Sequence, residues 1–194
     1  MDMAFDALGE ASDEALVVLF AGGDPAAARA LTLRLVPLAV RVARRMLGDA
    51  AEAEDVAQEA LLRLWKVAPE WRQGEARVST WLYRVVSNLC IDRLRRRRSV
   101  GIDAIAEPAD DRPSATEGLI AADRAAALEA ALAALPERQR QAVVLRHLEG
   151  LSNPEIAEIM EVGVEAVESL TARGKRALAA ALAGRREELG YGHD

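Results

Sequence analysis

Residues 93–98 read RLRRRR, so arginine occupies five of six consecutive positions in a chain whose formal net charge is −6. Guanidinium groups bind phosphate oxygens without distinguishing one base from another. A second basic cluster lies near the C-terminus and consists of Arg173, Lys175, Arg176, Arg185 and Arg186. Two basic segments in an otherwise acidic chain predict a protein that holds nucleic acid at two points.

The sequence shows no recognisable arrangement of catalytic or metal-binding residues. The single cysteine, Cys90, and the two histidines, His147 and His193, do not have the spacing of metal ligands. The sequence offers no nucleophile beside a base and no glycine-rich loop that would hold a nucleotide phosphate. We therefore predict a protein that is not an enzyme and that uses no cofactor and no metal.

The N-terminal segment, MDMAFDALGEASDEALVVLF, lacks the basic start of a secretory signal. Charged residues interrupt every apolar run before it reaches the roughly 18 residues that span a bilayer. We therefore predict a cytoplasmic protein with no membrane span.

Helices are expected to position the basic residues, because 51% of the chain is apolar and only 4% is aromatic. A first long helix is predicted to begin at Asp24-Pro25, and Pro37 is expected to kink or divide it. A second helix is predicted over residues 49–68, where apolar residues recur at helical period.

The arginine run ends a third predicted helix, over residues 79–98, which Ser79 can cap. Its buried stripe is predicted to consist of Leu82, Val85, Val86 and Leu89. The opposite side carries Arg84, Asn88, Ile91, Asp92 and Arg95. This mixed, largely polar side is the face on which we expect binding.

Helical periodicity is lost over residues 99–121, where prolines, glycines and five acidic residues predict a flexible acidic linker. Beyond it, Ser152 and Glu155 have the spacing of a capping box, and Gly163 falls in a short turn before another helix. These features predict a helix-turn-helix. The predicted fold is all-α, with two small helical domains over residues 1–98 and 122–184, joined by the linker and followed by a tail over residues 185–194.

Three segments resemble a known family, in its order and spacing: DAAEAEDVAQEALLRLWK, STWLYRVVSNLCIDRLRRRR and LPERQRQAVVLRHLEGLSNPEIAEIMEVGVEAVESLTARGKRAL. They are similar to regions 2.2, 2.3 to 2.4 and 4 of the sigma-70 family, in its extracytoplasmic-function (ECF) group. The resemblance implies a sigma factor that directs bacterial RNA polymerase to specific promoters. The implied partners are the polymerase core, through its β′ clamp helices and β flap, promoter DNA and an anti-sigma factor.

The resemblance also implies roles for individual residues. Contact with the polymerase core is assigned to the exposed side of residues 52–67, through Asp55, Gln58, Glu59, Leu62 and Lys66. Recognition of the minus-ten element as a single strand is assigned to Trp71, Arg84, Ser87, Asn88, Ile91, Asp92, Arg95 and Arg96. The loop over about residues 70–78 is implied to receive a flipped base. Recognition of the minus-thirty-five element is assigned to Arg146, Ser169, Ala172, Arg173, Lys175 and Arg176.

Several of these residues also have a purely structural interpretation. Taken by itself, the acidic side of residues 52–67 is typical of an ordinary solvated helix face. Asp92 has the spacing of a helical ion pair with Arg96, a contact that stabilises by a few tenths of a kcal/mol. Trp81 lies beside an apolar stripe and can be a core residue rather than a platform for bases.

The helix-turn-helix departs from the family pattern in its second helix. Two positions where the family commonly has basic side chains hold Glu168 and Leu170. Gly174 is expected to weaken the helix by up to about 1 kcal/mol. Either the DNA element is unusual, or binding relies on phosphate contacts from basic side chains of the preceding helix. These side chains are Arg138, Arg140 and Arg146.

Without a nucleotide-binding loop, the energy for opening DNA must come from binding the captured strand. One alternative to a sigma factor is a free-standing dimeric helix-turn-helix repressor, which would bind duplex DNA tightly without polymerase. Another is an interaction module that sequesters an anti-sigma factor without binding DNA, and this module would support no transcription when mixed with core polymerase.

Overall fold

The computed structural model describes residues 8, 10–72, 74, 77–99 and 116–183. These described segments are built from helices joined by short loops and contain no strand, which confirms the predicted all-α class. The helical elements are α2 (Asp13–Ala21), α3 (Pro25–Leu47), α4 (Ala50–Val67), η1 (Ala68–Glu70), α5 (Val78–Ser99), α6 (Thr116–Ala133), α7 (Glu137–Val143), η2 (Val144–Leu148), α8 (Asn153–Met160) and α9 (Val164–Ala183).

Contacts divide the chain into two compact units. The first comprises residues 1–44 and 50–90, and the second comprises residues 45–49 and 91–194. No helix within the described segments is long and apolar enough to cross a lipid bilayer.

In the first unit, α3 begins where the sequence predicts, because Asp24 Oδ1 accepts a hydrogen bond of 2.8 Å from the backbone N–H of Ala26. Pro37 lies inside α3 and does not divide it. The ring removes the hydrogen bond to the carbonyl of Leu33, a residue that is 59% exposed, so solvent can reach this side of the helix.

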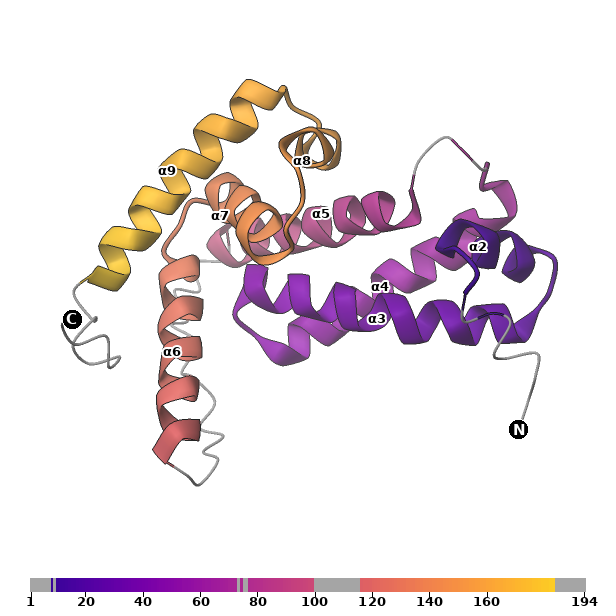
Figure 1. Cartoon of the computed structure of the whole chain (residues 1–194), viewed down its shortest axis with the longest axis horizontal. Coiled ribbons are helices and arrows are strands. Elements are labelled where there is room, and N and C mark those ends of the chain that lie inside the picture. Colours follow the sequence, from indigo (N-terminus) through magenta and orange to yellow (C-terminus); the bar gives the residue numbers. More distant parts are fainter. Residues whose placement is uncertain (1–7, 9, 73, 75–76, 100–115, 184–194) are drawn as a thin grey trace. The chain divides into compact units, whose positions relative to one another are not determined.

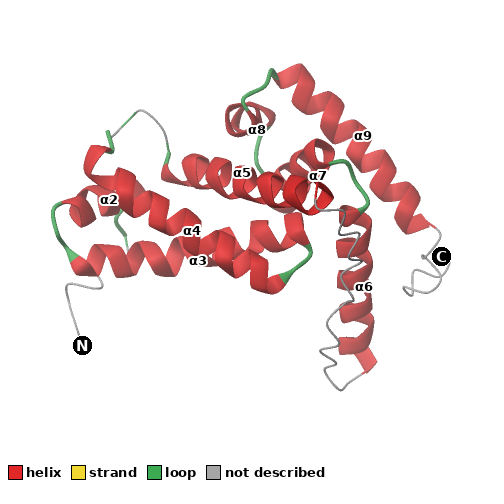
Figure 2. Ribbon diagram, turned by 180° about the vertical axis from the view of Figure 1, so that it is seen from behind, coloured by secondary structure: helices red, strands yellow, loops and turns green. Residues whose placement is uncertain are grey.

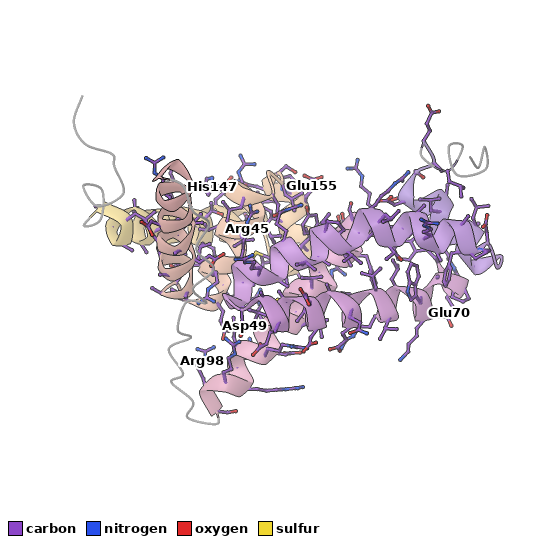
Figure 3. All side chains as sticks on the ribbon, turned by 90° about the horizontal axis from the view of Figure 1, so that it is seen from below. Arg45, Asp49, Glu70, Arg98, His147 and Glu155 are labelled. Carbon is purple, nitrogen blue, oxygen red and sulfur yellow. The ribbon has the colours of Figure 1, made fainter. Side chains whose placement is uncertain are left out.

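The core of the first unit forms between α2, α3, α4 and the first half of α5. Its largest fully buried side chains are leucines, namely Leu16, Leu31, Leu35, Leu64 and Leu82. α3 and α4 run side by side (Figures 1 and 3). The Phe20 ring packs on Trp65 with the ring centroids 4.5 Å apart, which joins α2 to the end of α4.

The second unit contains the predicted helix-turn-helix, formed by α8 and α9 (Figure 2). The capping box is confirmed: the Ser152 hydroxyl accepts from the N–H of Glu155, and the Glu155 carboxylate accepts from the N–H of Ser152 at 2.9 Å. α8 ends at Glu161, whose φ of 54° is left-handed. This short turn sends the chain directly into α9.

Two details of the sequence prediction are wrong. Ser79 does not cap α5, because the helix already begins at Val78 and receives its cap from elsewhere in the chain. α6 begins at Thr116, inside the range predicted as linker, since TEGLIAADRAAALEAALA is rich in strong helix formers. Residues 100–115 of the predicted linker and residues 185–194 of the predicted tail lie outside the described residues.

Candidate nucleic-acid interface

One long side of α5 carries polar side chains at helical spacing. Asn88, Asp92, Arg95 and Arg96 are exposed and Arg84 is half-buried. We call these five residues the α5 surface. Because α5 is unbroken from Val78 to Ser99, the amide, the carboxylate and the arginines lie along a single rigid element. Arg98 extends from the last turn of the same helix (Figure 3).

Two residues of the predicted minus-ten set do not belong to this surface. Ser87 is 0% exposed and Ile91 is 7% exposed, so neither side chain can contact DNA in this structure. The buried side of α5 is broad and includes Val86, Leu89 and Cys90. Ser87 and Ile91 flank that stripe, and they are removed from the candidate interface.

Trp71 lies just after η1, at the start of the loop that leads to α5. Its ring meets Trp81 edge to face, with centroids 6.1 Å apart, and both side chains are half-buried. The pair therefore packs as part of the first unit while remaining partly open to solvent. Residues 73, 75 and 76 of the loop predicted to receive a base lie outside the described residues.

Glu14 fixes the start of α5, a role that the sequence prediction missed. Its Oε1 accepts a hydrogen bond of 3.1 Å from the N–H of Val78, the first residue of the helix. Burial alone would raise the pKa of Glu14, but backbone hydrogen bonds from Glu14 and Val78, then the Ser12 hydroxyl and the charge of Arg77, hold the pKa below its usual value.

α4 carries the second predicted surface. Asp55, Gln58, Leu62 and Lys66 are exposed and Glu59 is half-buried, and we call these five residues the α4 surface. Leu62 is 52% exposed, and the carboxylate of Glu59 pairs with Arg63 one turn later at 2.6 Å. A large apolar side chain thus stands open to solvent among charged neighbours.

An apolar groove adjoins Leu62. It has a volume of about 260 Å³ and lies between α3 and α4. Its lining includes Val36 and Val40 from α3, and Leu61, Leu62 and Trp65 from α4. The α4 surface therefore combines carboxylates with an apolar recess, an arrangement that suits a partner presenting both apolar and basic side chains.

The exposed side of α9 carries Ser169, Ala172, Arg173, Lys175 and Arg176, which we call the α9 surface. Arg173 donates to the Ser169 hydroxyl at 3.0 Å. On the opposite side, Val167 and Gly174 are buried. α9 therefore presents a partly basic face outward, as the second helix of a DNA-binding helix-turn-helix does.

The structure shows the surroundings of the three residues of α9 that depart from the family pattern, Glu168, Leu170 and Gly174. Glu168 is exposed, and its Oε1 accepts a hydrogen bond of 3.4 Å from Asn153 at the start of α8. Leu170 is half-buried. A Cβ added at Gly174 would lie 2.6 Å from Val143 Cγ2 and 3.1 Å from the Gln139 carbonyl oxygen, so glycine lets α9 approach α7 closely.

Arg140 is not available to DNA phosphates, contrary to the suggestion from the sequence. It is 6% exposed, and its guanidinium donates to the carbonyl oxygens of Ala133 and Leu135, the second at 3.4 Å. Carbonyls at the end of a helix lack partners within the helix, and Arg140 satisfies that of Ala133, the last residue of α6. Arg138 is exposed and donates to the carbonyl of Met160 at 3.1 Å.

Positive charge gathers where η2 approaches α9. Arg146 is exposed and donates to the Leu151 carbonyl at 2.8 Å, and His147 follows it (Figure 3). Burial lowers the pKa of His147, and the charges of Lys175 and Arg146 lower it further. The charges of Lys175 and Arg146 that act on His147 would favour an anionic ligand here.

A metal site is not formed by the described segments, which contain no group of three or more histidine, cysteine or acidic side chains placed to hold an ion. Cys90, the single cysteine of the chain, is buried.

Two family models match the chain. The model described as sigma-70 region 2 matches residues 31–100, and the model described as sigma-70, region 4 matches residues 125–178. The first match contains most of α3 and all of α4 and α5, and the second contains α8 and most of α9.

Curated relatives match over most of the chain. The ECF RNA polymerase sigma factor SigM of Mycobacterium tuberculosis is 34% identical over 179 residues, which cover 91% of this chain and 88% of SigM. The RNA polymerase sigma-H factor of Pseudomonas aeruginosa is 32% identical, covering 90% of this chain and 96% of that protein. The ECF RNA polymerase sigma factor SigW of Bacillus subtilis is 31% identical, covering 69% and 77%.

Solved structures share the fold. CnrH, in complex with the cytosolic domain of CnrY, superposes with a TM-score of 0.66 at 24% identity, covering 89% of this chain and 97% of CnrH. The sigma factor RpoE of Bartonella quintana, in complex with the anti-sigma factor NepR, superposes with a TM-score of 0.61 at 22% identity, covering 78% and 93%.

Proposed function

The chain belongs to the ECF group of the sigma-70 family, and from this membership we propose that it directs bacterial RNA polymerase to specific promoters and captures the melted minus-ten strand. The observation that carries the proposal is the α5 surface. Asn88 and Asp92 are exposed one turn apart on an unbroken helix that ends in arginines. Side chains that hydrogen-bond to base edges thus precede side chains that bind phosphate.

Capture of separated bases can supply the energy for opening DNA. Extruding a base costs a few kcal/mol, and stacking on protein side chains returns about 1 to 3 kcal/mol for each base. A surface that binds only the separated strand shifts the duplex toward the open state once the complex is in place. The protein thus acts by binding, and the chemistry of RNA synthesis belongs to the polymerase.

The α4 surface is the proposed contact with the polymerase core, on the β′ clamp helices. Its exposed Leu62 and the adjoining apolar groove supply area to bury, and Asp55 and Glu59 complement a basic helical partner. In the second unit, the α9 surface with Arg146 is the proposed contact with the minus-thirty-five element, and the β flap is the proposed polymerase contact of this unit.

The proposal includes a cytoplasmic location and an anti-sigma partner. RNA polymerase works in the cytoplasm, so a protein that acts on it must be present there. RpoE, which shares this fold, was solved in complex with the anti-sigma factor NepR. Because that likeness extends to the fold alone, the anti-sigma partner of this chain requires its own test by co-purification.

Run-off transcription with core polymerase on a promoter library tests the proposed function. The wild-type chain is expected to produce transcripts from a subset of promoters that share two sequence elements. Asn88→Ala is expected to lower transcription about tenfold or more, since a base contact contributes about 1 to 3 kcal/mol. Polymerase binding, measured by co-elution, should remain unchanged. Absence of promoter-specific transcripts from the wild-type chain would reject the proposal.

A further inference from the structure

We propose that Glu168 recognises a cytosine in the minus-thirty-five element, by accepting a hydrogen bond from the cytosine N4 amino group in the major groove. This inference rests on the proposed function, because it requires α9 to enter DNA. It assigns a specific base to a side chain that replaces a basic residue of the family pattern.

The position of Glu168 on α9 suits contact with a base edge. Glu168 is exposed, and it shares its side of the helix with the exposed Ser169 and Ala172. Val167 is 0% exposed and fixes the opposite side against the rest of the unit. Glu168 lies in the second turn of α9, and residues near the N-terminal end of the second helix contact base edges in helix-turn-helix proteins.

The charge of Glu168 restricts which DNA group it can meet. A carboxylate is repelled by phosphates, so its presence on a DNA-facing side is unfavourable unless a base donor binds it. In the major groove, guanine presents only the acceptors N7 and O6, and thymine presents the acceptor O4. Adenine has the N6 donor, but its N7 acceptor lies beside it and would repel a carboxylate. Cytosine presents the N4 donor alone, which makes it the base that a carboxylate favours.

A neighbouring amide directs the carboxylate. Asn153, in the first turn of α8, donates from Nδ2 to Glu168 Oε1 at 3.4 Å. An exposed hydrogen bond of this length contributes little stability, but it biases the side-chain rotamer. The carboxylate has a second oxygen, Oε2, which can accept from a base while Oε1 remains with Asn153.

Substitutions of Glu168 test the assignment, because they should change which base is preferred at one position of the element. We expect holoenzyme reconstituted with the wild-type chain to select cytosine at one position of a randomised minus-thirty-five element. Glu168→Gln should shift the preference at that position to adenine by about tenfold, because glutamine pairs bidentately with adenine N6 and N7. Glu168→Ala should abolish the preference. Each variant is first checked for helical content by circular dichroism.

Glu165→Gln is the control, since it removes an equal charge from an exposed glutamate one turn earlier on the same helix. It should leave the base preference at the Glu168 position unchanged. Uniformly stronger binding to all sequences by Glu168→Gln, or wild-type selection without cytosine, would overturn the assignment while leaving promoter-specific transcription intact. Loss of all promoter-specific transcription by the wild-type chain would instead reject the proposed function, and the assignment with it.

Discussion

Among the individual residues, Leu62 is notable because a half-exposed leucine on a charged helix face has lost part of the free energy that burial would give it. Apolar side chains near the centre of a contact surface contribute most of the binding energy, provided that charged residues around them exclude water. The Leu62 side chain is surrounded by the other members of the α4 surface and opens onto the groove between α3 and α4.

Leu62→Asp is therefore expected to weaken binding to core polymerase by about 2 kcal/mol or more, roughly thirtyfold, when measured by fluorescence-based titration. Leu33→Asp is the matched control, because Leu33 is 59% exposed on α3 and does not line the groove. Equal loss of affinity in both variants would show that the α4 surface is not the polymerase contact.

At the scale of single elements, the start of α5 is capped by a carboxylate from α2, a helix far away in the sequence. The Glu14 pKa is lowered in the folded protein, so the folded state binds fewer protons than the unfolded state. The stabilisation is present above the ordinary pKa of 4.5 and is lost as the pH falls through the lower folded value. Acid should therefore loosen the start of α5.

Glu14→Gln is accordingly expected to be less stable than the wild-type chain at pH 7, and the difference should shrink as the pH falls below 4.5. All three tryptophans lie between residues 65 and 81, so their fluorescence during chemical unfolding reports on the first unit. The exposed Glu70 supplies a control, since Glu70→Gln should show a smaller difference at pH 7. A Glu14→Gln difference that is constant with pH would contradict the capping role.

α9 offers a second test, at Gly174. Glycine to alanine in a helix ordinarily stabilises by up to about 1 kcal/mol. Here the added methyl would lie 2.6 Å from Val143, and overpacking of this kind costs about 1 to 3 kcal/mol. Gly174→Ala should therefore lower the midpoint of thermal unfolding, as followed by circular dichroism.

The exposed Ala177 calibrates this measurement, because Ala177→Gly reports the propensity difference on the same helix without a packing change. If Gly174→Ala raised the midpoint by the amount that Ala177→Gly lowers it, close approach of α7 and α9 would not be the reason for the glycine.

Short-range signals made the elements predictable, and long-range contacts explain the errors. The capping box of Ser152 and Glu155 is complete within four residues, so it could be recognised in the sequence. The cap of α5 joins Glu14 to Val78 across 64 positions, and no local pattern records it. Gly174 similarly has the sequence signature of a weak helix, and only the approach of α7 reveals why glycine is needed.

The candidate site was harder to predict than the fold. Helical periodicity identifies the side of α5 that carries Asn88 and Asp92, but it does not give the width of the buried side. It therefore places Ile91 outward, and the resemblance adds Ser87 to the minus-ten set, although both side chains are buried. Arginines rarely lie in a core, so the sequence indicates a surface cation at Arg140, yet its guanidinium donates to the carbonyl of Ala133 at the end of α6 and to that of Leu135. Its burial depends on contacts that the sequence does not display.

At the scale of the whole molecule, the balance of charge opposes binding to DNA by the protein alone. The chain has 31 acidic residues against 25 lysines and arginines. Net negative charge adds repulsion from DNA, which opposes the favourable phosphate contacts that the local basic surfaces could make. The local basic surfaces should therefore act when a larger partner holds the DNA against them.

In a mobility-shift assay, the purified chain is expected to bind promoter duplex with a dissociation constant weaker than about 10⁻⁶ M at physiological salt. Addition of core polymerase should produce a tight, promoter-specific complex. Tight binding to the duplex by the chain alone would favour a free-standing repressor instead. The assay should be repeated at two salt concentrations, because the affinity that comes from phosphate contacts falls as salt rises.

Because α5 is one unbroken helix, it fixes the distances between the residues along it. Its 22 residues span about 33 Å. One extra residue inserted between Asn88 and Arg95 would rotate every later side chain by about 100° about the helix axis. The arginines would then no longer share a side of the helix with Asn88. In the proposed complex, the helix therefore fixes the distance between the base that Asn88 contacts and the phosphate that Arg95 contacts, and promoters should vary little in that spacing.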